Sequence, residues 1–506
     1  MISKIIRPLF PLLLCATAVP SAQAETWHRA DTANFVIFSS GKERELQRLA
    51  EKVERLDALL RMLYRIPAEP AEAKLTIYLF DRVEDVRDAA GNTGNTLHGY
   101  YQSHILGSYF VSHLEDGSKF ELGAQAVLFH EYTHHFMARY FRFAYPAWYR
   151  EGFAEYYATA TFDRKGNWTY GRPPRYRSYD LLSRDPISIE KLLFAEPSEL
   201  NRKEQLDLYA RGWLLTHYMH RSKNRTDRLL AYLREVGLGG DARQAAAEHL
   251  GDLAELNDAL DDYVSRRIVY KKGDNPIDYA GEISIRRLDD VSARLVELTL
   301  ANYEGNNPAE TREELAELAE EMPRRADVLT QLAWAEAQLA EKRARESEEN
   351  ADTDYSVAIA KLDEALAIDA SNAKANALRG AWMLRTAESK ADFAEARKYI
   401  IAANRANPNH PYPLQLYHNS FTGASGRPPR DALDGMIRAF ELAPEVVDLR
   451  IELAFALANY GDYTSAISLM RILAGDPHNG HMAKELIRQL EARRDGRDYV
   501  PLPSVN

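Results

Sequence analysis

Apolar side chains follow two different patterns along the chain. In its first part, short apolar runs at residues 34–38 and 74–80 predict β-strands, and residues 42–64 between them have the apolar spacing of an amphipathic helix. From about residue 289 onward, helical spacing continues almost without interruption. The sequence therefore predicts an α+β unit followed by an all-α unit.

Three further segments of the first part have helical character. Residues 122–141 are rich in Ala, Leu and aromatic side chains and contain no proline, which predicts a buried helix. Pro146 predicts a turn, and residues 147–161 then predict a second helix with this proline at its start. Residues 206–219 predict a third. The polar residues of these helices carry the candidate chemistry.

The first of these helices contains His130-Glu131-Tyr132-Thr133-His134. Four residues rotate an α-helix by about 400°, so His134 lies within about 40° of His130, one turn along. Both imidazoles can therefore reach one metal ion. Glu131 lies on an adjacent face, where it can approach a metal-activated water molecule without binding the metal. This arrangement is typical of a catalytic zinc site, which keeps one position open for water.

A catalytic zinc ion takes three protein ligands, and Glu151 is the best candidate for the third. A helix, a short reversal and a second helix would return Glu151 to the two histidines. Glu155 lies four residues further on, on the same helical face. There it could accept a hydrogen bond from the free ring nitrogen of a ligating histidine. We therefore expect Glu155 to support the ligands and not to bind zinc.

The segment WYREGFAEY, residues 148–156, makes the pattern more specific. Together with the HEYTH motif it resembles the gluzincin metallopeptidases, the group that includes thermolysin and the zinc aminopeptidases. It is most similar to uncharacterised bacterial members that pair this domain with helical repeats. The resemblance implies a zincin-like fold, Zn²⁺ as cofactor, and the following roles: zinc ligation by His130, His134 and Glu151, the general base Glu131, and the supporting carboxylate Glu155.

Two features depart from the family pattern. The sixteen residues between His134 and Glu151 form a slightly shorter gap than in the best-known members, and Arg150 stands where many of them have Asn. Neither change removes a ligand, but both leave the substrate preference open. The same residues also allow a structural interpretation, with core histidines and ordinary ion pairs, or a domain that binds zinc without catalysis.

A peptidase also needs a donor that stabilises the oxyanion of the tetrahedral intermediate. Gluzincins often supply it from a Tyr or His downstream, and Tyr209, near the start of the helix over residues 206–219, is the candidate. A core tyrosine with a satisfied hydroxyl is the alternative. The run over residues 108–112, just before the metal helix, could be the edge strand along which a peptide lies, or an ordinary sheet strand.

The N-terminal residues predict export. Lys4 and Arg7 precede an apolar run over residues 9–19, and Ala22-Gln23-Ala24 matches the small-residue pattern of a signal peptidase site. We expect a signal peptide over residues 1–24 and a periplasmic or secreted bacterial protein. An uncleaved anchor is the alternative, although the run is short for a bilayer span.

Composition narrows the range of partners. The formal net charge of −11 would become −13 after loss of Lys4 and Arg7 with the signal peptide, which argues against nucleic acid. The only cysteine, Cys15, lies within that segment, so no disulfide is expected in the mature protein. No later segment has the length and hydrophobicity of a transmembrane helix.

The all-α unit shows a repeating pattern. Residues 271–288 predict a linker, and residues 289–495 predict helix pairs that close at Asp369-Ala370, Asn407-Pro408, Ala443-Pro444 and Asp476-Pro477. These spacings of 38, 36 and 33 residues lie around the tetratricopeptide period of about 34, and the last copy resembles that family. Such repeats stack into a solenoid that binds proteins or peptides, or that braces the neighbouring domain. Residues 496–506 are expected to form an unpacked tail.

We therefore predict an exported zinc-dependent peptidase, with a catalytic domain over residues 25–270 and repeats that bind substrate or partner proteins. No other cofactor site is expected. Endopeptidase action is slightly favoured, because the aminopeptidase motif G-x-M-E-N is not found upstream. The rival hypothesis is a cell-envelope scaffold that acts through its repeats and has a silent metal site. Glu131 favours catalysis, since a structural zinc site has no use for a base.

Overall fold

The computed structural model describes residues 26–91, 97–117, 120–141, 145–279, 281–346, 353–422, 427–474 and 480–497. The expected signal peptide over residues 1–24 lies outside these ranges, as does most of the tail expected over residues 496–506. In the described part of the chain, no helix is long and apolar enough to cross a membrane.

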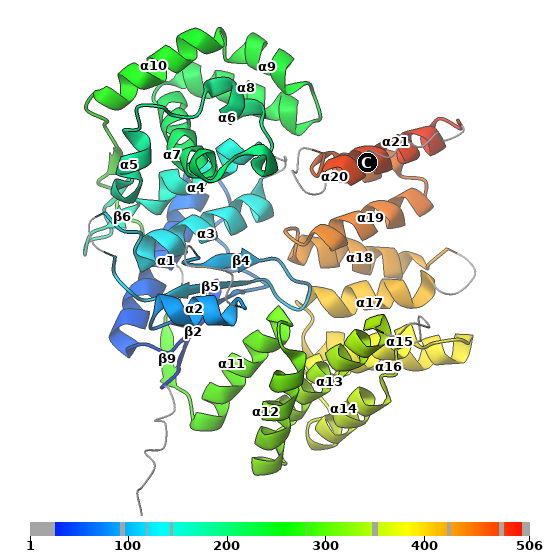
Figure 1. Ribbon diagram of the computed structural model, residues 1–506. Helices are drawn as coiled ribbons and strands as arrows, with labels where there is room; N and C mark the ends of the chain where they lie inside the picture. Colours follow the sequence, from blue (N-terminus) through cyan, green and yellow to red (C-terminus); the bar gives the residue numbers. More distant parts are fainter. Residues whose placement is uncertain are drawn as a thin grey trace, which may run out of the picture.

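A six-stranded mixed sheet lies at the centre of the N-terminal half, in the order β4-β5-β3-β2-β1-β9 (Figure 1). The strands β2, β3 and β5 are parallel, and the other three pair antiparallel with their neighbours. The six strands are β1 (His28–Asp31), β2 (Phe35–Ser39), β3 (Leu75–Phe80), β4 (Tyr100–Gln102), β5 (Tyr109–His113) and β9 (Ser284–Arg287). A second, three-stranded sheet contains β6 (Thr161–Phe162), β7 (Trp168–Tyr170) and β8 (Lys271–Gly273).

Helices cover the sheet and extend beyond it. They are α1 (Glu43–Tyr64), α2 (Val83–Ala89), α3 (Ala124–Tyr140), α4 (Ala147–Ala158), α5 (Ser178–Leu181), α6 (Ile189–Phe194), α7 (Arg202–Met219), α8 (Lys223–Gly237), α9 (Ala242–His249) and α10 (Leu253–Ser265). Two short 3-10 helices, η1 (Arg175–Arg177) and η2 (Pro197–Glu199), lie in the connections. The strands expected at residues 34–38 and 74–80 and the helix expected at residues 42–64 correspond to β2, β3 and α1.

The two faces of the large sheet have different cores, because successive side chains of a strand point to opposite sides. On one face, Ile37, Ile77 and Phe110 pack in a large apolar cluster with the buried residues of α1, α3, α4 and α7. On the other face, Tyr78 and Val111 pack with α2 and with α11, the first helix of the C-terminal region. The helix α3, which contains His130 and His134, is therefore held against the sheet by the larger core.

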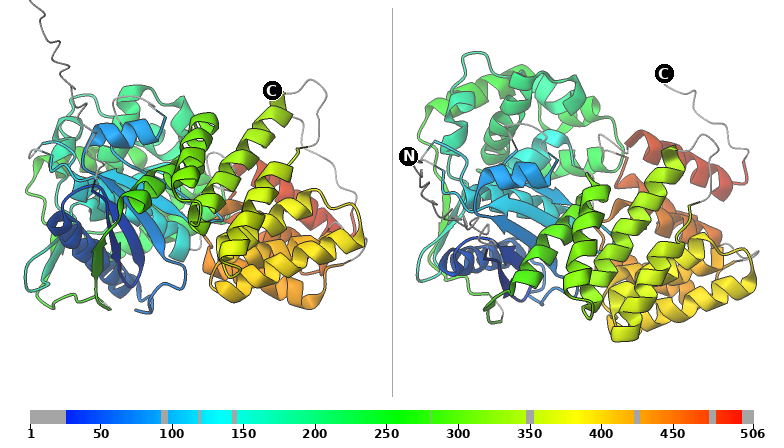
Figure 2. Two further views of the ribbon diagram at one scale, coloured as in Figure 1. Left: turned by 90° about the horizontal axis from the view of Figure 1, so that it is seen from below. Right: turned by 60° about the horizontal axis from the view of Figure 1, so that its bottom comes forward.

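The C-terminal region is entirely helical in its described residues. Its helices are α11 (Asp290–Glu304), α12 (Pro308–Glu321), α13 (Ala326–Glu346), α14 (Ser356–Ile368), α15 (Ala373–Arg385), α16 (Lys390–Ala406), α17 (Pro411–Thr422), α18 (Arg430–Leu442), α19 (Val447–Asn459), α20 (Tyr463–Arg471) and α21 (Gly480–Arg494). Successive helices pack on each other and form a curved array beside the N-terminal half (Figure 2). We call α11–α21 the repeat region.

Helix pairing in the repeat region follows the expected closing signals. The C-cap residues of α14, α16 and α18 are Asp369, Asn407 and Ala443, the first residues of three of those signals. The fourth signal, at residues 476–477, lies outside the described residues. The pairs α13–α14, α15–α16, α17–α18 and α19–α20 thus form a helical-repeat architecture, with α11 and α12 before them and α21 after them.

One expectation about the sheet was wrong, and for a second segment the structure decides between two alternatives. Residues 271–288 do not form a simple linker, since they contain β8 and β9, and β9 pairs with β1 through His28 and Arg287. The run over residues 108–112 corresponds to β5 and is an ordinary sheet strand, the second of its two alternatives, because β4 pairs with its outer side through Tyr101 and Phe110. The pairing of β1 with β9 joins segments that are distant in the sequence, which local patterns do not record, whereas β4 and β5 form a local hairpin.

The loop between β4 and β5 connects the two halves of the molecule. Its Leu106 packs in the apolar cluster of α13–α15, and Ile105 packs in the cluster of α18 and α19. The carbonyl oxygen of Leu106 accepts hydrogen bonds from the Tyr303 hydroxyl at 3.2 Å and from His410 Nε2 at 3.3 Å. The repeat region therefore holds this loop between its helices, which agrees with a bracing role.

Candidate metal centre

The helices α3 and α4 bring together the three expected metal ligands. The Nε2 atoms of His130 and His134 lie 3.0 Å apart. An oxygen of Glu151 lies 3.2 Å from the first and 3.3 Å from the second. Pro146 precedes α4, and its carbonyl oxygen accepts the first backbone hydrogen bonds of that helix, so the chain reverses between the helices as expected.

The spacing of these three atoms fits a zinc ion. Zinc bonds of about 2.0–2.1 Å in a tetrahedral arrangement place neighbouring ligand atoms about 3.3 Å apart. The donor set of two imidazoles and one carboxylate is one that catalytic zinc sites use. The side chains of His130, His134 and Glu151 are 13, 22 and 16% exposed, so solvent can reach the point they surround.

The electrostatics of the two carboxylates differ. Burial acts to raise the pKa of Glu151, but the adjacent His134 and His130 outweigh it and hold this pKa well below its usual value. Burial raises the pKa of Glu131 to about 7; His134 opposes the shift, and the charges of Glu151 and Glu155 add to it. The carboxylate of Glu151 is thus anionic, as expected for a metal ligand, whereas Glu131 has the near-neutral pKa that suits proton transfer.

The helix α7 packs very closely on α4, and two glycines allow this contact. A Cβ atom added at Gly152 would lie 2.3 Å from the backbone oxygen of Gly212, and one added at Gly212 would lie 2.6 Å from the backbone oxygen of Trp148. Such separations are far below van der Waals contact. The glycine that follows Glu151 therefore permits the approach that brings α7, and with it Tyr209, to the metal ligands.

Tyr209 lies beside the candidate metal centre. Its ring centroid is 5.9 Å from that of His130, and the guanidinium of Arg177 lies over its ring at 4.6 Å. The charge of Glu151, followed by burial, raises the pKa of the Tyr209 hydroxyl well above its usual value. The hydroxyl is therefore protonated at neutral pH and can donate a hydrogen bond. The structure thus places the expected oxyanion donor near the site.

Glu155 is buried behind the ligands, at 1% exposure. Its Oε1 lies 3.8 Å from His130 Nδ1, which is longer than a hydrogen bond. Its closer partners are the Tyr176 hydroxyl, which donates to Oε2 at 2.6 Å, and Arg177, which donates from Nε at 3.0 Å and lies within 2.9 Å through Nη2. Sequence analysis did not identify Tyr176 or Arg177, since they follow no motif and reach Glu155 only through the fold.

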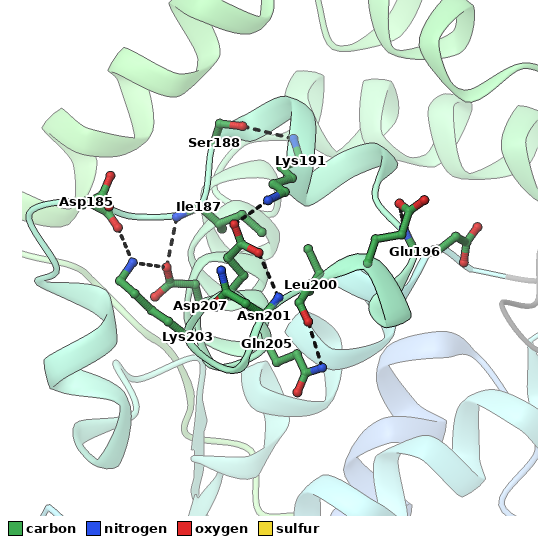
Figure 3. Close-up of polar contacts among 12 residues, drawn as sticks. Asp185, Ile187, Ser188, Lys191, Glu196, Leu200, Asn201, Lys203, Gln205 and Asp207 are labelled. Carbon is green, nitrogen blue, oxygen red and sulfur yellow. Dashed lines mark hydrogen bonds and ion pairs between the residues drawn. The ribbon is translucent and has the colours of Figure 1, made fainter.

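The start of α7 is fixed by polar contacts (Figure 3). Asn201 caps the helix, and its side chain and that of Glu204 each bond the backbone of the other in a capping box. The buried Asp207 accepts hydrogen bonds from the backbone nitrogen of Ile187 at 3.1 Å and from Lys203 Nζ at 3.0 Å. Because Tyr209 follows within one turn, these contacts also fix its position.

A cavity of about 380 Å³ adjoins the metal centre and lies between the two halves of the molecule. We call it the cleft. Its wall on the N-terminal side includes Glu131, His134, Glu151 and the edge strand residue Tyr101. Its opposite wall comes from the repeat region, from the α18–α19 turn and α19 and from the residues that follow α20. The repeats are thus part of the surface that faces the candidate site.

One other His and carboxylate group in the described residues has metal-like spacing: Glu235, Glu248 and His249. His249 Nε2 already lies 2.8 Å from Glu235, and Glu248 is exposed. None of these three described residues lines the cleft. His135, next to the ligand His134, is buried and hydrogen-bonds the Tyr101 hydroxyl at 3.0 Å, as expected for a packing residue.

Comparison with known proteins yields only distant structural similarity. No protein-family model matches the chain, and no curated protein matches it. MamA from Desulfovibrio magneticus RS-1 is 18% identical and covers 41% of this chain and 98% of its own, with a TM-score of 0.27. TTC0263, a thermophilic TPR protein in Thermus thermophilus, is 16% identical and covers 40% of this chain and 96% of its own, with a TM-score of 0.29.

Proposed function

We propose that the protein is a zinc-dependent peptidase. One observation carries this proposal: the metal-binding atoms of His130, His134 and Glu151 lie 3.0–3.3 Å apart, at the edge of a cleft that Glu131 also lines. Three ligands at zinc spacing form a metal site. A base beside them, open to a cavity, is the addition that hydrolysis requires and that a structural site lacks.

When bound at this site, zinc supplies a Lewis acid that lowers the pKa of water and polarises a carbonyl group. The chain's own residues perform the proton transfers. Glu131 takes a proton from the attacking water molecule and passes it to the leaving amine. The Tyr209 hydroxyl donates a hydrogen bond to the oxyanion. Glu155, held by Tyr176 and Arg177, keeps a negative charge behind His130.

The cleft supports a peptide as the substrate. The strand β4 (Tyr100–Gln102) is an edge of the large sheet, and Tyr101 and Ser103 line the cleft. An edge strand can pair with an extended peptide through main-chain hydrogen bonds. We propose that β4, and not β5, has this role. Endopeptidase action remains slightly favoured, and the sequence of residues 1–24 supports a periplasmic or secreted location.

The test combines metal analysis with peptide cleavage. The full mature chain is loaded with zinc, its metal content is measured, and a diverse peptide mixture is offered to it. We expect about one zinc per chain and cleavage that Glu131→Gln abolishes while zinc remains bound. Glu235→Gln, which alters the second His and carboxylate group, is the matched control and should change neither result. Absence of zinc binding would refute the proposal.

A second candidate function is a protein-binding scaffold that acts through the repeats, with a silent metal site. The array of stacked helix pairs favours it, since helical repeats commonly present surfaces for proteins or peptides. Zinc binding without cleavage, together with a partner whose binding survives Glu131→Gln and His134→Ala, would support this function over catalysis. Pull-down by the His134→Ala variant is the corresponding measurement.

A further inference from the structure

One arginine of the repeat region faces the cleft without an acidic partner. Arg450, in the first turn of α19, lines the cleft and is 7% exposed. It donates from Nη2 to the carbonyl oxygen of Pro444 at 2.8 Å, and its guanidinium lies 4.8 Å from the centre of the Phe440 ring. No carboxylate among the described residues forms an ion pair with it.

The nearest acidic residue is engaged elsewhere. Glu445 accepts a hydrogen bond from Ser108 Oγ at 3.0 Å and lies 3.3 Å from Arg139 Nη1. Its charge raises the pKa of Arg450, but burial outweighs it and lowers that pKa to about 10. A buried charge without a charged partner is unfavourable. Binding of an anion beside this guanidinium therefore lowers the free energy of the protein.

The charged side chains that line the cleft indicate which class of anion Arg450 binds. Arginine is the side chain best suited to bind a carboxylate, because its planar fork can donate two parallel hydrogen bonds. Arg150, on α4 beside Glu151, adds a second guanidinium to the lining. The remaining charged groups of the lining are Glu131, His134, Glu151 and Glu445, of which three belong to the candidate metal centre and the fourth pairs with Arg139.

We infer that Arg450 binds a carboxylate of the peptide in the cleft, so that the repeat region selects substrates with an acidic group near the scissile bond. This inference rests on the proposed function, because it takes the occupant of the cleft to be a peptide. The carboxylate can come from an Asp or Glu side chain or from the peptide's C-terminus. The first source is compatible with endopeptidase action and the second with release of C-terminal residues.

Binding is measured first, in a form that needs no turnover. Fluorescently labelled peptides of one core sequence are prepared with a Glu or a Gln, each with a free or an amidated C-terminus. Their affinity for the zinc-loaded full-length Glu131→Gln protein is measured by anisotropy. We expect the acidic form to bind about tenfold or more tightly than its neutral counterpart. Weaker binding of the Gln peptide than of the Glu peptide assigns the contact to a side chain. Weaker binding of the amidated peptide than of the free acid assigns it to the C-terminus.

The role of Arg450 is then tested in the same assay. Arg450→Gln should remove the preference for the acidic peptide, and Arg450→Lys should keep part of it. A purely structural role would weaken binding of acidic and neutral peptides alike, which would overturn the inference. Arg430→Gln, at an exposed arginine that pairs with Asp434 within α18, is the matched control.

The two proposals can fail separately. If the wild-type protein cleaves nothing but the acidic preference exists and depends on Arg450, carboxylate binding by Arg450 stands, whereas the peptidase proposal fails and with it the selection of substrates. If the protein cleaves peptides without any acidic preference, or keeps that preference in Arg450→Gln, the inference is overturned and the peptidase proposal stands. Cleavage profiles of wild type and Arg450→Gln on one peptide mixture provide the second readout.

Discussion

In the N-terminal half, one apolar core extends from Ala30 to Ile277 and includes buried residues of α1, α3, α4 and α7. In the repeat region, the buried side chains form several smaller clusters, each shared by neighbouring helices. A disturbance in this large core can reach the three expected metal ligands, whereas one in the repeats stays between adjacent helices. The two halves therefore contribute differently: the first positions His130, His134 and Glu151, and the second forms the opposite wall of the cleft.

The largest expected effect comes from removing a ligand. His134→Ala should lower the zinc affinity by at least about 100-fold and abolish cleavage, because only two of the three protein ligands remain. His418→Ala removes a more deeply buried histidine from the repeat region and should leave zinc affinity unchanged. Zinc titration against a competing chelator measures both. Equal losses in the two variants would contradict the separation of roles.

A pair of glycine substitutions compares helix packing in the two halves. In Gly212→Ala the new Cβ meets the backbone oxygen of Trp148 at 2.6 Å, and in Gly380→Ala it meets the Ile400 side chain at the same distance. A side chain can shift more easily than a helix backbone. We expect Gly212→Ala to cost about 3 kcal/mol in free energy of unfolding and Gly380→Ala about 1 kcal/mol.

Calorimetric unfolding and zinc titration together measure this pair. Gly212→Ala should also weaken zinc binding, because α4 carries Glu151 and must move. Gly380→Ala should leave zinc binding intact. If both variants lowered zinc affinity, the repeats would be coupled to the metal centre more tightly than their separate clusters indicate.

Substitutions of two arginines with similarly exposed side chains compare an ion pair beside the candidate metal centre with one in the repeat region. Arg177 holds the buried Glu155 behind His130, and Arg379 pairs with the exposed Asp363 between α14 and α15. Arg177→Gln should lower zinc affinity by about 10- to 100-fold, as is typical when a partner behind a metal ligand is lost. Arg379→Gln should change neither zinc affinity nor activity and should cost less than about 1 kcal/mol of stability. Zinc titration and thermal unfolding give the comparison.

The smallest expected effect concerns the contact between the halves. Arg139 of α3 bonds the carbonyl oxygen of Leu442 at 2.9 Å and pairs with the buried Glu445. Arg139→Gln leaves that carboxylate without its charged partner beside the cleft, so KM should rise several-fold while zinc affinity is retained. Arg438→Gln, which breaks the exposed pair with Glu72 across the same interface, should have little effect. Steady-state kinetics on one peptide substrate distinguishes the two variants.

The expected ligand set could be found in the sequence because its geometry is local. Helical periodicity alone places His134 over His130, and Pro146 gives the reversal that returns Glu151. Most predicted helices and strands agree with the structure for the same reason. The helix expected over residues 206–219 begins earlier, at Arg202, because Asn201 caps it there.

The remaining features depend on contacts between distant segments. Tyr176 and Arg177 lie in a connection with no motif, and only the fold places them against Glu155. The strand β4 is an exception: it forms a local hairpin with β5 and is the edge of the sheet, but a strand of three residues is too short to show a periodic pattern. Arg450 lines the cleft from a repeat helix that follows the HEYTH motif by some 300 residues in the sequence. Sequence patterns therefore predict the ligands well and their surroundings poorly.

The pairing of β1 with β9 has a consequence for the order in which the protein can fold. His28 pairs with Arg287, so the first and last strands of the large sheet are neighbours in space although nearly the whole N-terminal half lies between them in the sequence. A chain synthesised or exported from its N-terminus cannot complete this sheet until residue 287 has emerged. Until then β1 keeps an unpaired edge, which is prone to intermolecular association. A truncation after α10 would make that transient edge permanent.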